Sequence, residues 1–215
     1  MTARKVLLAA TVMTALAGCQ TQGEIVVDSG VGISALRSLC PSVGVPDFTG
    51  NVTLFTPAEA RTADALDVTA TITNLRSQCN ETGAQVYTAA TFDVIAQRRD
   101  TRGARRVELP YFSTVVRGGN VVVAKRLGTV TLDFADGAER AQARGTAAAY
   151  VDRAAATLPD DIRERITRRR RAGEEAAAVD PLSVPEVREA VARATFELLV
   201  GFQLSEEQLG FNATL

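Results

Sequence analysis

The sequence predicts a mainly β protein, an antiparallel β-sandwich that ends in a small α-helical appendage. Two observations predict this class. Between Asn51 and about Arg153, apolar and polar residues alternate in about seven short runs, with no helical pattern between them. After Leu158 the spacing becomes helical. The composition, 46% hydrophobic and 23% charged, is typical of a folded globular domain and excludes a disordered chain.

The predicted strands share β-branched residues and flanking turn signals, and they cover residues 51–55, 66–73, 86–97, 107–117, 121–134 and 141–152. Pro110 predicts a sheet edge or a bulge. Gly128 predicts a break in its strand, and Arg117-Gly118-Gly119-Asn120 predicts a hairpin turn. An immunoglobulin/fibronectin-like sandwich of about 100 residues fits this spacing best, although the Cys-Trp-Cys signature of true immunoglobulin domains is absent.

The region after residue 157 is predicted to contain helices. Pro159 suits the start of a first helix, which Gly173 can end. A capping-box spacing at Ser183–Glu186 predicts a second helix over about 185–195. Residues 196–204 are left open between helix and strand, and their strict alternation favours a strand that returns to the sheet. Ser205 and Gln208 form a second capping box before a short terminal helix.

The N-terminus has the pattern of an export signal. Arg4 and Lys5 precede an apolar stretch over residues 6–17, which is too short for an ordinary membrane-spanning helix. Leu16-Ala17-Gly18-Cys19 resembles the lipobox of bacterial lipoproteins. The resemblance implies cleavage before Cys19, lipidation of its sulfur and acylation of the new amino terminus, so that Cys19 would anchor the chain to a membrane. Gln20 favours the outer membrane, because an aspartate at that position favours inner-membrane retention in enterobacterial lipoproteins.

The C-terminal stretch resembles an uncharacterised group of alphaproteobacterial envelope lipoproteins. Residues 196–204, 208–209 and 212–214 carry this resemblance, which implies no activity. The expected organisation is a signal peptide over 1–18, a lipidated linker over 19–50, a sandwich over 51–156 and a helical region over 157–215. Removal of residues 1–18 takes two basic residues from a chain with 24 basic and 25 acidic ones, which leaves a net charge of −3.

Cys40 and Cys79 form the remaining pair of cysteines. In an oxidising periplasm we expect them to form a disulfide, which stabilises by roughly 4 kcal/mol on the chain-entropy model. Without histidine they do not complete a zinc site, so no metal and no cofactor is expected. The Gly30-Val31-Gly32 stretch matches a dinucleotide-binding loop only superficially, because Pro41 and Pro46 interrupt the helix that this motif requires.

Two clusters of arginine are candidate sites for an anionic partner. The first contains Arg98, Arg99, Arg102, Arg105 and Arg106. The second contains Arg168, Arg169, Arg170 and Arg171, with Arg163 and Arg165 just before them. Docking of the second cluster against the acidic segment that follows residue 172 explains it equally well. The compartment and the few nearby aromatic residues argue against nucleic acid.

The absence of histidine excludes Ser-His and Cys-His catalysis, and the neighbouring carboxylate pairs do not face each other on a helix. The sequence therefore predicts a non-enzymatic adaptor or structural subunit of the cell envelope, with an envelope protein as partner. A glycan- or anionic-lipid-binding module that uses Tyr87, Tyr111 or Phe112 is the first alternative. A hydrolase with scattered carboxylates is the second.

Overall fold

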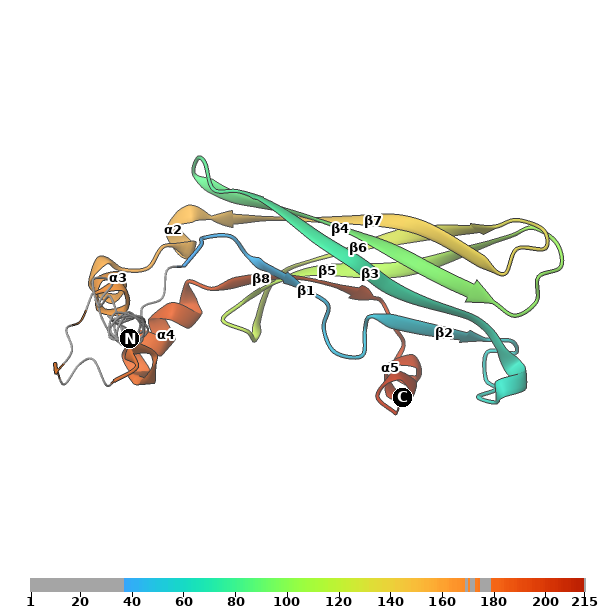
Figure 1. Ribbon diagram of the computed structural model, residues 1–215. Coiled ribbons are helices and arrows are strands. Elements are labelled where there is room, and N and C mark those ends of the chain that lie inside the picture. The colour runs from blue at the N-terminus through green and yellow to red at the C-terminus, as the bar shows by residue number, and fades with distance from the viewer. Residues whose placement is uncertain (1–36, 169, 171–172, 175–178, 215) are drawn as a thin grey trace, which may run out of the picture.

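The computed structural model describes residues 37–168, 170, 173–174 and 179–214 (Figure 1). The chain forms two four-stranded sheets that pack face to face. One sheet has the order β1 (Ser42–Gly44), β8 (Phe196–Phe202), β5 (Arg105–Arg117), β6 (Val121–Phe134). The other has the order β2 (Asn51–Phe55), β3 (Leu66–Asn80), β4 (Gln85–Arg98), β7 (Arg140–Asp152). The predicted mainly β sandwich is confirmed, while the immunoglobulin/fibronectin-like arrangement stays a prediction.

Strand pairing is antiparallel except between β1 and β8. β3 runs beyond the predicted residue 73, because a bulge between Thr73 and Arg76 moves its last residues to the exposed surface, where alternation is no longer required. β5 is a central strand, but its pairing with β8 begins only at Tyr111. Pro110 therefore lies where β5 has no partner strand on the β8 side, which is a local sheet edge. Gly118 and Gly119 form the predicted turn with φ of 63° and 81°.

Gly128 does not break β6, so this prediction is wrong. β6 continues from Val121 to Phe134, and Gly128 pairs with Tyr111 of β5. The tyrosine ring lies directly over the glycine: a β-carbon at position 128 would lie 2.5 Å from the Cζ atom of Tyr111. The glycine therefore serves side-chain packing and not a turn.

The interior of the sandwich has two parts. Large side chains, including Phe92, Phe134 and Phe202, form the main core between the two sheets. A smaller cluster near the helices combines alanines, such as Ala90 and Ala149, with Val115, Val151 and Leu198, and Phe196 is its one aromatic member among the described residues. The two parts of the interior thus differ in the volume of side chain that fills them.

Short helices cover one end of the sandwich (Figure 1). They are α2 (Arg153–Ala156), α3 (Asp160–Thr167) and α4 (Pro185–Arg193), with a 3-10 turn at Pro181–Ser183. A second 3-10 turn, Ala63–Ala65, precedes β3 at the opposite end of the sandwich. Ile162, Ile166 and Val187 form a separate small core between α3 and α4. The predicted capping box at Ser183–Glu186 is wrong, since Val184 occupies the N-cap position of α4 without a side-chain hydrogen bond.

The alternating residues 196–204 form β8, as their period favours, and this strand pairs with both β1 and β5. The capping box of Ser205 and Gln208 is confirmed at the start of α5 (Glu206–Asn212). α5 packs beside β2, where Phe55 and Phe211 meet edge to face at 5.4 Å. Two strands of the sandwich, β1 and β8, thus come from outside the predicted boundaries of 51–156.

The predicted signal peptide 1–18 and Cys19 lie outside the described residues. Among the residues that the structure describes, no helix has the length and apolar character needed to cross a membrane.

Candidate functional site

The first half of β6 is the most exposed apolar segment of the sandwich. Val121, Val122, Val123 and Leu127 are 50–68% exposed. Every residue from Val121 to Leu127 is exposed, so neither face of this segment is covered. Monomeric proteins rarely leave such contiguous apolar surface in water unless it binds something.

This segment is also a free sheet edge. β6 pairs with β5 on one side, and among the described residues no strand pairs with its other side. A free edge presents unpaired backbone N–H and C=O groups to solvent. In Figure 1 the start of β6 diverges from β7, the edge strand of the other sheet. The protein therefore offers backbone hydrogen-bonding groups and apolar side chains in the same place.

A groove runs beside this edge, between β6 and β7. It consists of two adjoining hollows of about 370 and 80 Å³, which share Ser113, Arg126 and Ala148 in their walls. Alanines of β7, Ala147 to Ala149, form much of one wall, and Tyr111 closes one end. Because alanine side chains are short, they leave open space between β6 and β7 at this position.

Tyr111 marks the boundary between the packed core and the groove. Its ring packs edge to face on Phe92 at 5.2 Å, and its hydroxyl donates a 2.7 Å hydrogen bond to the Thr146 carbonyl of β7. The side chain therefore crosses from one sheet to the edge of the other. Gly128 makes room for this crossing, as described above.

The groove carries positive charge. Among the described residues that line it, Arg126 is the one charged side chain, and it forms no ion pair with a described carboxylate. Lys125 precedes Arg126 in β6 and points to the other face of the sheet. Its Nζ atom lies 5.2 Å from the centre of the Phe112 ring. Tyr87 of β4 and Tyr150 of β7 contact each other beside the groove, with ring centroids 4.9 Å apart and the rings tilted. A ligand here would meet one uncompensated cation among apolar and hydroxyl groups.

The first predicted arginine cluster lies at the opposite end of the sandwich. The prediction that Arg98 belongs to an anion-binding surface is wrong, because its side chain is 1% exposed. Its guanidinium donates four hydrogen bonds to the backbone carbonyls of Thr101, Gly103, Ala135 and Ala138. Arg98 thus joins the turn after β4 to the turn after β6, and these carbonyls satisfy its buried guanidinium.

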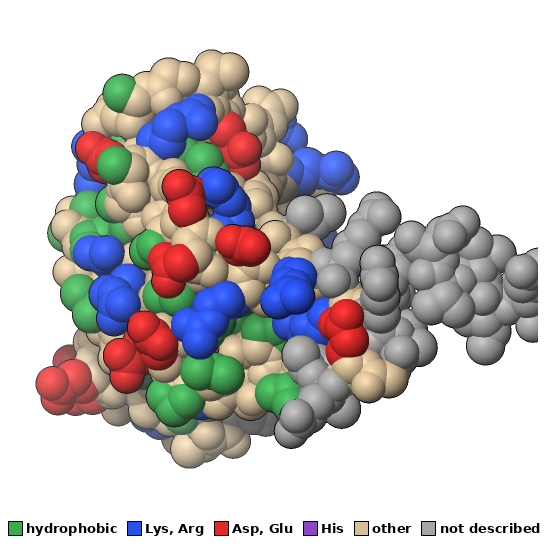
Figure 2. Space-filling model, turned by 90° about the vertical axis from the view of Figure 1, so that its left-hand side faces the viewer, with side chains coloured by type: hydrophobic (Ala, Val, Ile, Leu, Met, Phe, Trp, Pro, Cys, Tyr) green, Lys and Arg blue, Asp and Glu red, His purple; other side chains and the backbone are tan. Residues whose placement is uncertain are grey.

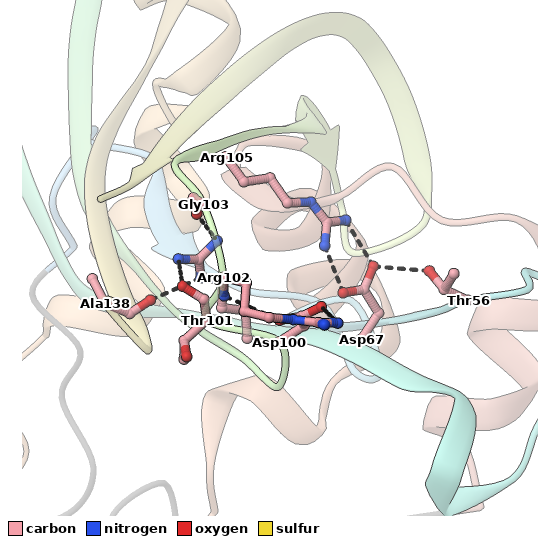
Figure 3. Close-up of polar contacts among 9 residues, drawn as sticks. Thr56, Asp67, Asp100, Thr101, Arg102, Gly103, Arg105 and Ala138 are labelled. Atoms are coloured by element: carbon pink, nitrogen blue, oxygen red, sulfur yellow. Dashed lines mark hydrogen bonds and ion pairs between the residues drawn. The ribbon is translucent and has the colours of Figure 1, made fainter. Parts of the chain in front are cut away.

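The other arginines of this cluster pair with aspartates, as Figure 3 shows for two of them. Arg105 forms a two-pronged pair with Asp67 at 2.6 and 2.7 Å, and Arg102 contacts Asp100 at 2.7 Å. Arg106 pairs with Asp133, and Arg99 lies 3.9 Å from Asp64. An anionic ligand would have to displace these aspartates, so the cluster is a poor anion site.

The hydrogen bonds from Arg105 lower the pKa of the Asp67 carboxyl, and a hydrogen bond from Thr56 adds to this effect. The contact with Arg102 lowers the pKa of Asp100 strongly. Both aspartates are therefore fixed as anions at neutral pH. The hollow that they line together, about 470 Å³, is wide and contains as much acidic as basic side chain.

The second predicted cluster lies at the helical end. Arg170 is 7% exposed and donates to the Arg165 carbonyl, so its inclusion in an exposed binding surface is wrong. Arg168 is exposed, while Arg169 and Arg171 lie outside the described residues. Arg165 pairs with Glu186 of α4 at 3.2 Å, which supports the internal docking alternative. Basic and acidic side chains are interspersed over this end of the molecule (Figure 2).

Cys40 and Cys79 form the predicted disulfide, which joins the segment before β1 to the end of β3. Glu81 Oε1 lies 3.0 Å from the Cys40 sulfur and accepts a hydrogen bond from the Ser38 hydroxyl, which lowers the pKa of its carboxyl. Cys40, Cys79 and Glu81 are the only group of three potential metal ligands among the described residues. The disulfide leaves neither sulfur as a thiolate ligand.

The chain matches no protein-family model, no curated protein and no solved structure. Function must therefore be argued from the site. Sequence reasoning missed the groove and Arg126. One signal was present: Val121-Val122-Val123-Ala124 contains no polar residue, which a strand with one wet face should have.

Proposed function

We propose that this protein is a lipid-anchored, non-enzymatic adaptor of the cell envelope that binds an extended segment of a partner protein along the free edge of β6. The exposure of Val121–Leu127 on both faces of an edge strand is the observation that supports it. In such strand addition, backbone hydrogen bonds supply affinity and side-chain contacts supply specificity. We also propose that the sandwich is immunoglobulin/fibronectin-like, because an open sandwich of this kind has edge strands that can pair with another chain.

The charge of the site defines the partner further. Arg126 and Lys125 adjoin in β6, and no carboxylate stands among the described residues that line the groove. A partner strand with an acidic residue opposite Arg126 would supply the missing anion, and apolar residues would cover Val123 and Leu127. Edge lysines and bulges can also serve to prevent aggregation. Protection alone does not account for four large apolar residues left in water.

Site-specific photocrosslinking in native envelopes tests this proposal. A photoreactive residue at Leu127 should capture one protein through a peptide that contains an acidic residue. The same residue at Ile95, an apolar position of β4 that is 46% exposed, is the matched control and should not capture it. The variant Arg126→Glu should reduce the crosslink about tenfold, and a lysine in place of the partner's acid should restore it.

Other results would overturn the proposal. Crosslinks between two copies of this chain would indicate self-association. Recovery of only glycan or lipid would favour the first alternative, a binding module that uses the tyrosines of the groove. A crosslink that Arg126→Glu leaves unchanged would contradict the charge argument.

The lipid anchor is tested separately. The Cys19→Ala variant should leave the membrane fraction and appear in the soluble envelope fraction, since a sandwich without acyl chains has no stable anchor. Gradient separation of the two membranes then shows whether the unaltered protein resides in the outer one. Membrane retention of Cys19→Ala would contradict the anchoring proposal without affecting the strand-addition proposal.

A further inference from the structure

A second concave site, with different lining residues from the groove, lies at the helical end of the molecule. It is a pocket of about 340 Å³ between the segment that precedes β1 and the α2–α3 region. This volume lies within the range of small-ligand pockets. The pocket has an apolar floor and a basic rim, and each part comes from a different feature of the chain.

The floor consists of residues that α2 and α3 bury. Ala156, Leu158 and Ile166 are 2–8% exposed, and Leu39 adds a partly buried side chain from the opposite wall. Leu158 and Ile166 also belong to the small core between α3 and α4. The floor is therefore built by packed residues and does not depend on a mobile side chain.

Three arginines line the same pocket: Arg37, Arg153 and Arg163. Arg37 donates to the Val191 carbonyl and the Thr195 hydroxyl, and its burial lowers its pKa. Arg153 donates through Nε to the Gly83 carbonyl. Neither forms an ion pair with a carboxylate of the described residues. Two partly buried cations thus donate to backbone and hydroxyl oxygens, and Arg153 also helps to lower the pKa of the nearby Glu81 carboxyl.

Arg163 is paired with Asp160 at 2.7 Å, but both side chains are more than half exposed. Such a surface pair contributes little and exchanges readily with another anion. Among the described residues that line the pocket there is no aspartate or glutamate. The pocket wall therefore combines three guanidinium groups with an apolar floor. Basic side chains lie beside hydrophobic ones at this end of the molecule (Figure 2).

We propose that this pocket binds an anionic amphiphile, with an acyl chain against Leu39, Leu158 and Ile166 and a carboxylate or phosphate headgroup between Arg153 and Arg163. Guanidinium groups bind both kinds of headgroup through paired hydrogen bonds. A free fatty acid and an anionic phospholipid share this chemistry. The apolar floor disfavours a free inorganic anion, because an inorganic anion would leave that surface in water.

The test uses a photoactivatable palmitate analogue added to isolated envelopes that contain the full chain. Addition after isolation prevents its incorporation into the lipid anchor. After irradiation, mass spectrometry should find the label in peptides from residues 153–167. Excess palmitate should compete, whereas hexadecanol, which has the same chain without the charge, should not. Competition by phosphatidylglycerol but not by palmitate would identify a phospholipid headgroup as the natural source.

Variants test the rim. The double variant Arg153→Gln with Arg163→Gln should reduce labelling about tenfold, since two charge-assisted contacts are lost. Arg188→Gln, an exposed arginine of α4 outside the pocket, is the matched control and should label normally. The hexadecanol comparison uses the unaltered protein, so it holds even where a variant folds poorly. Equal competition by hexadecanol, or label spread over the strands, would overturn the proposal.

Discussion

The two halves of the sandwich interior differ in how they hold the sheets together. In one half, Phe92, Phe134 and Phe202 fill the space between the sheets. In the other, Ala90, Ala149 and their neighbours are too short to fill the same space. We call the half that these phenylalanines fill the closed half and the half with the groove the open half. The disulfide and the α2–α4 helices lie at the end of the open half. The groove and the exposed β6 segment both belong to it.

The two halves are stabilised by different means, and this explains why open space between the sheets is tolerated in only one of them. Apolar burial by large side chains stabilises a sheet pair without other devices. Where small residues replace them, a covalent crosslink limits the unfolded chain instead. That arrangement leaves the β6 edge free for a partner while the fold remains intact. Substitutions in the two halves can therefore be compared directly.

The largest effect is expected in the closed half at Arg98. Arg98→Ala removes four hydrogen bonds and the packing of a buried side chain, and should lower the free energy of unfolding by roughly 4 kcal/mol or more. Urea denaturation measures this. Arg102→Gln, whose parent side chain is 90% exposed, is the control and should change it by less than about 1 kcal/mol. Similar values for the two variants would contradict the buried role of Arg98.

The disulfide should matter next, and mainly in the open half. Replacing Cys40 and Cys79 together with serine opens a loop with a sequence separation of 39 and should cost about 4 kcal/mol. Hydrogen exchange should increase most in β1 and at the end of β3. The unaltered protein in a reducing agent should behave in the same way. Uniform loss of protection in both halves would contradict this division.

The boundary between the halves is tested at Gly128. Gly128→Ala places a β-carbon within 2.5 Å of the Tyr111 ring and should lower stability by about 1–3 kcal/mol, as over-packing does. In a Tyr111→Ala background the same change should have little effect, because the ring is gone. Denaturation of the four proteins gives this double-mutant cycle. Additive effects would show that the clash is not the cause.

The pH dependence of the closed end is expected to come partly from Asp67. Its pKa is lowered by Arg105, so its stabilisation is complete above the ordinary aspartate pKa and is lost as pH falls through the folded value. Asp67→Asn should cost about 0.5–1 kcal/mol at pH 7, and the difference should shrink below about pH 4. Thermal melting across pH measures it. Asp47→Asn, at an exposed loop position, is the control.

The smallest effect is expected on the β6 edge. Val123→Thr, at a position 50% exposed, should change stability by less than about 0.5 kcal/mol, whereas the same substitution at the buried Val94 should cost about 1–3 kcal/mol. Both positions lie in strands, so β-propensity is matched. A large cost at Val123 would mean that this segment is covered in solution, and would end the contrast between the halves.

Local patterns in the sequence predicted much of the fold. The period-two runs identified six strands, and the alternation at residues 196–204 favoured β8 over a helix. Such patterns depend on contacts within a few residues, as does the capping box of Ser205. The Cys40–Cys79 pairing also followed from the chain alone, given an oxidising compartment. Each of these predictions needed only short-range chemistry or a count.

The tertiary structure alone decided which edges stay free and which charges are used. Arg98 and Arg126 are both arginines in strand-forming stretches, yet one is buried on carbonyls and the other lines a groove. Sequence spacing does not distinguish them, because the turns around Arg98 and the neighbours of Arg126 come from distant parts of the chain. Sheet order is likewise a matter of long-range pairing. The composition and local period determined a β-sandwich, and the order of its strands determined where that sandwich can bind.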